Sequence, residues 1–133
     1  MKVFKSKFQT IEFLNEVSIL LNTYTKESED LTEDLYKAEL LSYVEQIKTY
    51  KPQKTISDLR DFSYPIVPSL QEWHAKTLFP VAESVGIKKV AILLPQELFS
   101  LVSAQQTLEE DKQGKFQTKY FENEKDAYNW LKS

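Results

Sequence analysis

The chain has 133 residues, of which 41% are hydrophobic and 28% are charged, and its formal net charge is −3. This length and composition predict one globular domain, over residues 1–133, with enough apolar side chains for a core. The negative charge argues against a nucleic-acid-binding protein, because such a protein needs a basic face.

The absence of cysteine excludes disulfides, thiolate catalysis and cysteine-based zinc sites. The apolar runs, such as AILLP at 91–95, are far too short to span a bilayer. The charged start MKVFKSKFQT contains no signal-peptide core. We therefore expect a cytoplasmic protein without a membrane span.

The first elements predicted along the chain are two strands. Residues 3–13 are rich in Val, Phe, Thr and Ile, which predicts a strand, and a change of parity in the apolar positions indicates a bulge or bend. Asn15 and Glu16 suit a two-residue turn. Apolar residues then alternate over 17–21, so we expect the chain to open with a β-hairpin.

A long amphipathic helix is predicted next, from Thr32 to Tyr50, and Pro52 ends it. Acidic residues gather at its start and lysines at its end, as the helix dipole favours. Its apolar side chains recur at spacings of three and four: Tyr36, Leu40, Tyr43, Ile47 and Tyr50. A short strand is predicted over residues 54–60.

The second predicted helix begins at Ser69 and ends at Gly86. Ser69 is placed as its N-cap, with Glu72 as the capping-box partner. Pro80 lies inside this helix and is expected either to kink it or to split it, because proline donates no backbone hydrogen bond.

The remaining elements complete an α/β pattern. The apolar run 88–95 predicts a buried parallel strand, residues 98–108 a third helix, residues 115–121 a strand, and Asn123 caps a closing helix. The order is β-β-α-β-α-β-α-β-α. It predicts a mixed, mostly parallel sheet of four to five strands with about four helices.

In this order of elements the chain resembles the SpoIIAA-like, STAS/SEC14-type small α/β domains that occur as stand-alone bacterial proteins. The segments that carry the resemblance, besides the hairpin, are KTISDLRD at 54–61, LFP at 78–80 before Gly86, KKVAILLP at 88–95, ELFSLVSA at 97–104 and YFENEKDAYNWL at 120–131. The resemblance covers nearly the whole chain and implies a single STAS-type domain.

The resemblance also suggests two kinds of function. Better-known members are anti-anti-sigma factors, which are phosphorylated on a serine at the start of the helix after the central strand, within a motif like Asp-Ser-Ser-Gly. This chain has SDLRDFSYPIVPSLQEW at 57–73 instead, in which Ser63 or Ser69 stands nearest to that position. Other relatives hold lipids or small apolar molecules.

The same segment is the predicted functional surface, because ligands of open α/β sheets bind beyond the carboxyl ends of the strands. It contains the only arginine and the only histidine of the chain. The residues placed in this ligand or partner surface are Asp58, Arg60, Asp61, Phe62, Tyr64, Ser69, Trp73 and His74.

Each polar residue of this surface has a functional and a structural interpretation. Arg60 either binds a carboxylate or phosphate through its planar fork, or pairs with Asp58 or Glu72 and fixes the loop. Ser69 is either a helix cap or a phosphoacceptor. His74 is either a structural histidine or a general base oriented by Asp58 or Asp61.

The apolar loop from Phe62 to Val67 has to pack on something, which is the core, an internal pocket or another subunit. A lone histidine is a poor set of metal ligands, and no Gly-rich phosphate loop is present, so we expect no metal or cofactor.

The leading hypothesis is a regulatory or protein-interaction module that is not an enzyme and binds a protein partner or a second copy of itself. The second is a carrier of a small apolar ligand or lipid, with a pocket under residues 58–74. The third is a hydrolase-like enzyme that uses His74 with Asp58 or Asp61.

Overall fold

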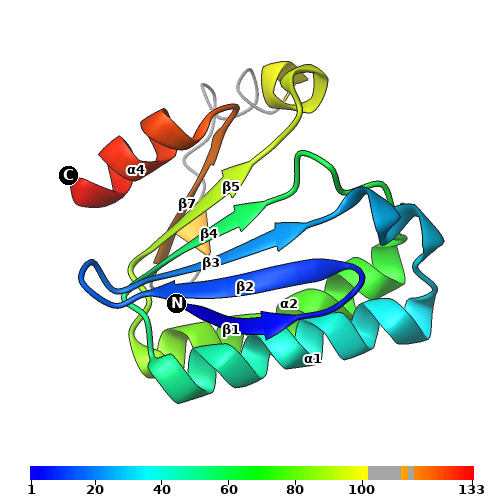
Figure 1. Ribbon diagram of the computed structural model, residues 1–133, viewed down its shortest axis with the longest axis horizontal. Coiled ribbons are helices and arrows are strands. Elements are labelled where there is room, and N and C mark those ends of the chain that lie inside the picture. Colours follow the sequence, from blue (N-terminus) through cyan, green and yellow to red (C-terminus); the bar gives the residue numbers. More distant parts are fainter. Residues whose placement is uncertain (102–111, 114–115) are drawn as a thin grey trace.

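A mixed β-sheet forms the centre of the protein in the computed structural model, which describes residues 1–101, 112–113 and 116–133 (Figure 1). The strand order is β1-β2-β3-β4-β5-β7-β6. The strands are β1 (Lys2–Lys5), β2 (Gln9–Leu14), β3 (Ile19–Tyr24), β4 (Lys54–Asp58), β5 (Lys89–Leu93), the two-residue β6 (Lys112–Gln113) and β7 (Phe116–Phe121).

The helices are α1 (Glu33–Tyr50), α2 (Pro68–Val85) and α4 (Glu124–Lys132), and a 3-10 helix, η1, spans Lys26–Asp30. Residues 96–101 are also helical, which agrees with the start of the predicted third helix. The rest of that helix, to Leu108, lies outside the described residues. None of the helices in the described part of the chain is long and apolar enough to cross a membrane.

The strand pairing confirms an α/β fold with a mixed sheet. Strands β3, β4, β5 and β7 pair in parallel, whereas β1, β2 and β3 pair antiparallel, as do β6 and β7. The expected number of four to five strands is too low, partly because residues 3–13 form two strands. Ser6 turns the chain between them, and its Oγ accepts hydrogen bonds from the amides of Phe8 and Gln9 at 3.1 and 3.2 Å.

Helices α1 and α4 begin at the predicted residues. The Thr32 Oγ1 accepts a hydrogen bond from the Leu35 amide at 3.2 Å, and the Asn123 Oδ1 accepts one from the Asp126 amide at 2.9 Å. Helix α1 ends in the left-handed conformation of Lys51, at φ 46°. In both helices a side-chain oxygen satisfies an amide that the helix itself leaves unpaired.

Helix α2 differs from the prediction at its start. It begins at Pro68, so Ser69 is its second residue and not its N-cap, and no side-chain hydrogen bond caps it. Proline is favoured at this first position because its fixed φ suits the helix and its missing N–H has no role there. The helix continues through Pro80 as one element and ends at Gly86, whose φ is 86°.

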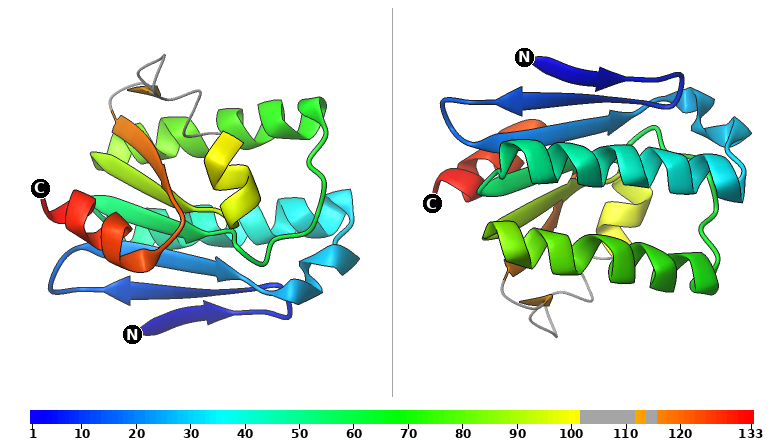
Figure 2. Two further views of the ribbon diagram at one scale, coloured as in Figure 1. Left: turned by 90° about the horizontal axis from the view of Figure 1, so that it is seen from above. Right: turned by 90° about the horizontal axis from the view of Figure 1, so that it is seen from below.

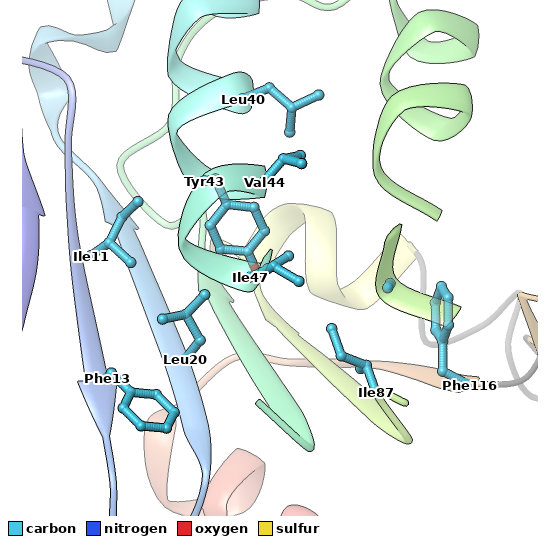
Figure 3. Packing of buried hydrophobic residues seen from close by; sticks show 10 residues of the cluster. Ile11, Phe13, Leu20, Leu40, Tyr43, Val44, Ile47, Ile87 and Phe116 are labelled. Carbon is cyan, nitrogen blue, oxygen red and sulfur yellow. The ribbon is translucent and has the colours of Figure 1, made fainter. Parts of the chain in front are cut away.

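The sheet separates two helical layers (Figure 2). Helices α1 and α2 lie side by side on one face, and α4 and residues 96–101 lie on the other. Side chains on the α4 face form a dense cluster of fully or nearly fully buried residues: Ile19, Ile56, Ala91, Leu93, Phe121, Ala127 and Leu131. The face toward α1 and α2 carries a second cluster, shown in Figure 3.

We predict that Leu131→Ala lowers the free energy of unfolding by about 2–5 kcal/mol, because it opens a cavity in the dense cluster under α4. Leu131 is 0% exposed. The control is Leu41→Ala on α1, where the leucine is 52% exposed and the expected change is about 0.5 kcal/mol or less. Chemical denaturation of both variants measures the difference, and equal losses would contradict the packing described for α4.

Candidate functional site

A cavity of about 300 Å³ lies between the sheet and helices α1 and α2. Figure 3 shows Leu40, Tyr43 and Ile47 extending from α1 on this side of the sheet. The lining is mostly apolar, and its volume is at the lower end of the range of about 300–1,000 Å³ found for small-molecule sites. Protein interiors seldom leave voids larger than a water molecule, so this space is unusual for a domain core.

The floor of the cavity is a patch of the sheet that carries polar side chains. The strand register places Asn22, Ser57, Ile92 and Tyr120 in one row across β3, β4, β5 and β7. A neighbouring row holds Thr55, Val90 and Thr118. All seven side chains line the cavity. Alternate residues of a strand share a face, which explains why these positions point to α1 and α2 together.

The roof comes from α1 and α2 and includes a contact between their aromatic side chains. The Tyr36 hydroxyl and His74 Nδ1 lie 2.6 Å apart and share a hydrogen bond. Burial lowers the pKa of His74 and raises the pKa of Tyr36. Both groups are therefore held in their neutral forms, and together they join the two helices across the cavity.

A second tyrosine of α1, Tyr43, reaches the polar floor. Burial raises its pKa, and hydrogen bonds with Thr55 and Ser57 partly offset this effect. The pKa of Tyr24, on β3, is raised mainly by burial and further by the neighbouring Tyr36 and Glu39. These three tyrosines are uncharged hydrogen-bonding groups in the cavity wall.

The predicted apolar loop packs on the core and closes one end of the cavity. The Phe62 ring meets the Tyr24 ring edge-on with centroids 4.9 Å apart, and the Tyr64 ring stacks on Tyr36 at 5.9 Å. Phe62 and Ile66 line the cavity, whereas Tyr64 and Trp73 pack behind it. A hydrogen bond of 2.9 Å from the Ser63 amide to Ser28 Oγ fixes the loop.

The charged residues of the predicted surface lie elsewhere. Asp58 follows Ser57 in β4 and so faces the α4 side of the sheet. Its carboxylate accepts hydrogen bonds from Arg60 Nε and Nη2 at 3.0 and 2.7 Å, and Nη2 also contacts Glu124 at 3.1 Å. Arg60 thus pairs with Asp58, one of the two partners that its structural interpretation offered, and its contact with Glu124 also joins the start of the loop to α4.

The structure does not bring His74 and Asp58 together, because the sheet lies between them. Asp61 is exposed, and its carbonyl oxygen accepts a hydrogen bond from Ser28 Oγ at 3.3 Å. Ser69 is exposed in the first turn of α2. Its role as a phosphoacceptor stays a prediction.

Sequence reasoning missed the polar residues of the floor, above all Asn22, which is 4% exposed, and also Gln9 beside it, which is 0% exposed. A signal for the floor exists, because Asn22 follows three apolar residues in the strand ILLNTY, and Thr55 and Ser57 occupy alternate positions in KTISD. The strands of a buried parallel sheet are usually apolar on both faces, so polar side chains at alternate positions indicate that one face is not fully covered by packed helix side chains. The described residues hold no group of three or more metal-ligating side chains.

Comparisons of the chain with protein-family models, curated proteins and solved structures gave no significant match. The resemblance to SpoIIAA-like STAS domains therefore stays a prediction.

We predict that His74 makes the protein less stable in mild acid. Its folded-state pKa is lowered by burial, so the unfolded chain binds this proton more readily below a pH of about 6.5. The free energy of unfolding should therefore decrease as the pH is lowered through this range. The part of this slope that comes from His74 is no steeper than about 1.4 kcal/mol per pH unit. Denaturation of the wild type and of His74→Phe at several pH values isolates this slope, and parallel curves would contradict it.

We predict that Arg60→Met lowers the free energy of unfolding by about 1–3 kcal/mol, because it leaves the Asp58 carboxylate without its paired cation. The Asp58 side chain is 10% exposed and that of Arg60 38%, so the pair is only partly screened by solvent. The matched control is Lys76→Met, whose ion pair with Glu72 is exposed on both sides and contributes about 0.5 kcal/mol or less. Equal effects in thermal or chemical denaturation would contradict a structural role for Arg60.

Proposed function

We propose that this protein binds a small, largely apolar molecule in the cavity between the sheet and helices α1 and α2. The observation that carries the proposal is the cavity itself, about 300 Å³ in volume, with apolar helix side chains above and polar strand side chains below. This is the arrangement of a small-molecule site, in which an apolar lining supplies affinity and a few polar groups fix orientation.

The accessibility of the cavity supports a ligand over a packing defect. The space is about 300 Å³ in volume and opens partly to the surface, so a small molecule can enter it. Pockets that bind small molecules are usually formed before the ligand arrives and lined mainly by apolar side chains, as this one is.

The position of the cavity also supports the proposal. Phe62 and Ile66 belong to the loop that follows the carboxyl end of β4, where ligands of open α/β sheets commonly bind. A pocket for a lipid or small apolar ligand was expected from the sequence in the same region, under residues 58–74. The closing wall differs, since Phe62 and His74 line the space and Tyr64 and Trp73 do not.

The regulatory or protein-interaction role in the cytoplasm, as a STAS-type module that is not an enzyme, stays a prediction. A surface for it would use exposed apolar residues near the same loop, such as Val67, which is 53% exposed. The hydrolase-like alternative has less support, because His74 forms a hydrogen bond with Tyr36, and Asp58 forms one with Arg60.

We predict that Ala82→Phe removes ligand binding and leaves the protein folded, because Ala82 lines the cavity and the added ring can enter it. The same change at Ala127, which is 0% exposed under α4, should overpack the core and cost about 1–3 kcal/mol or more. Native mass spectrometry of protein purified from its host reports whether a ligand is bound, and denaturation reports stability. Ala38→Phe, at an exposed position on α1, is the control that should keep the ligand.

Two results would count against the proposal. One is a wild-type protein that carries no adduct and binds none of a set of short alkyl alcohols, ethers and acids in titration calorimetry. The other is an Ala82→Phe variant as strongly destabilised as Ala127→Phe, since that would mean that the space near Ala82 cannot accept a ring.

A further inference from the structure

We infer that the ligand carries a neutral head group with a hydrogen-bond donor, such as a hydroxyl or an amide N–H, which it donates to Asn22 Oδ1. This inference rests on the proposed binding function and names the class of ligand. It follows from the fixed orientation of two buried amides and from the kinds of side chain that line the cavity around them.

The orientation of the Gln9 amide is fixed by its neighbour on α1. Gln9 Nε2 donates a hydrogen bond of 2.9 Å to the backbone carbonyl oxygen of Glu39. A carbonyl oxygen can only accept, so the reversed Gln9 amide would place two acceptors against each other. Gln9 Oε1 must therefore point the other way, toward Asn22.

The orientation of Asn22 follows from that of Gln9. Asn22 Nδ2 donates to Gln9 Oε1 at 3.3 Å, which leaves Asn22 Oδ1 on the opposite side of the amide. Asn22 is 4% exposed and lines the cavity. Among the described residues no hydrogen bond reaches its Oδ1, although a buried acceptor left without a donor costs about 1–3 kcal/mol.

The atom of Asn22 that has no partner is thus an acceptor, because the pair of hydrogen bonds through Gln9 permits no other orientation. Most buried polar atoms of folded proteins have a partner, and those that do not call for an explanation. A donor on the ligand supplies that explanation, and it would pair with Asn22 when the cavity is occupied.

The surroundings of Asn22 select a neutral donor. Among the described residues that line the cavity there is neither lysine nor arginine, and burial lowers the pKa of His74, so these residues offer no cation to balance an anionic head group at neutral pH. Aspartate and glutamate are likewise missing from the described residues that line the cavity. A cationic head would have to lose its hydration in a mostly apolar space without an ion-pair partner among the lining residues.

The test compares three alkyl probes of matched length: n-octanol, heptyl methyl ether and octanoate. Octanol and the ether have the same atoms, but only the alcohol donates a hydrogen bond. We expect the wild type to bind octanol about tenfold more tightly than the ether in titration calorimetry. Octanoate at neutral pH should bind more weakly than either.

A variant assigns the preference to Asn22. Asn22→Leu keeps the approximate size of the side chain and removes the acceptor, so the alcohol and the ether should bind with equal affinity. Asn129→Leu, the same substitution at an exposed position on α4, should keep the wild-type preference. If Asn22→Leu does not fold, Asn22→Ala takes its place, because it removes the same acceptor, and the expected loss of the alcohol preference is the same.

The possible failures are distinguishable. Equal binding of octanol and the ether by the wild type, or tightest binding of octanoate, would overturn the inferred head group and leave the proposed function standing. Retention of the alcohol preference in Asn22→Leu would also overturn it. If the wild type binds none of the probes, the proposed function itself is contradicted.

Discussion

The hydrogen bond from Gln9 Nε2 to the carbonyl oxygen of Glu39 connects the first hairpin to helix α1 and sets the polar character of the cavity. Both partners are buried, so water does not compete for this bond. The Glu39 side chain is fixed as well, because its carboxylate accepts a hydrogen bond of 2.6 Å from Ser6 Oγ. Ser6 in turn makes the turn between β1 and β2. One short chain of contacts therefore shapes the edge of the sheet, positions α1 and orients the amide of Asn22.

The two faces of the sheet use the same backbone for different purposes. Toward α4 the strands present aliphatic and aromatic side chains that pack densely, while toward α1 and α2 the alternate positions of β3 and β4 present Asn22, Thr55 and Ser57. A polar strip cannot pack against apolar helix side chains without losing hydrogen bonds. Because the helices stand away from the sheet at this strip, the polar strand side chains and the apolar helix side chains do not have to pack directly on each other. The fold therefore has one solid layer, under α4, and one hollow layer, which contains the cavity under α1 and α2.

The sequence predicted the elements better than it predicted the site. Helix periodicity and caps placed α1 and α4 correctly, since Thr32 and Asn123 act within a single turn of chain. Only a bulge or bend was predicted within residues 3–13, because the turn at Ser6 depends on one hydroxyl that accepts hydrogen bonds from two amides. The segment 57–74 was predicted as the functional surface because it contains the only arginine and the only histidine of the chain. Arg60 and Asp58, however, pair on the face of the sheet opposite to the cavity. The cavity itself depends on which strands become neighbours, and no local pattern contains that information.

His74 is the only histidine of the chain, and it stands in the cavity wall, bonded to Tyr36. Its imidazole protons therefore give the only histidine signals in the magnetic resonance spectrum of the protein. The two tryptophans divide in the same way, because Trp73 packs near the hollow layer and Trp130 packs against the solid one. The molecule thus carries native probes that report separately on its two layers, and occupancy of the cavity can be followed without attaching a label.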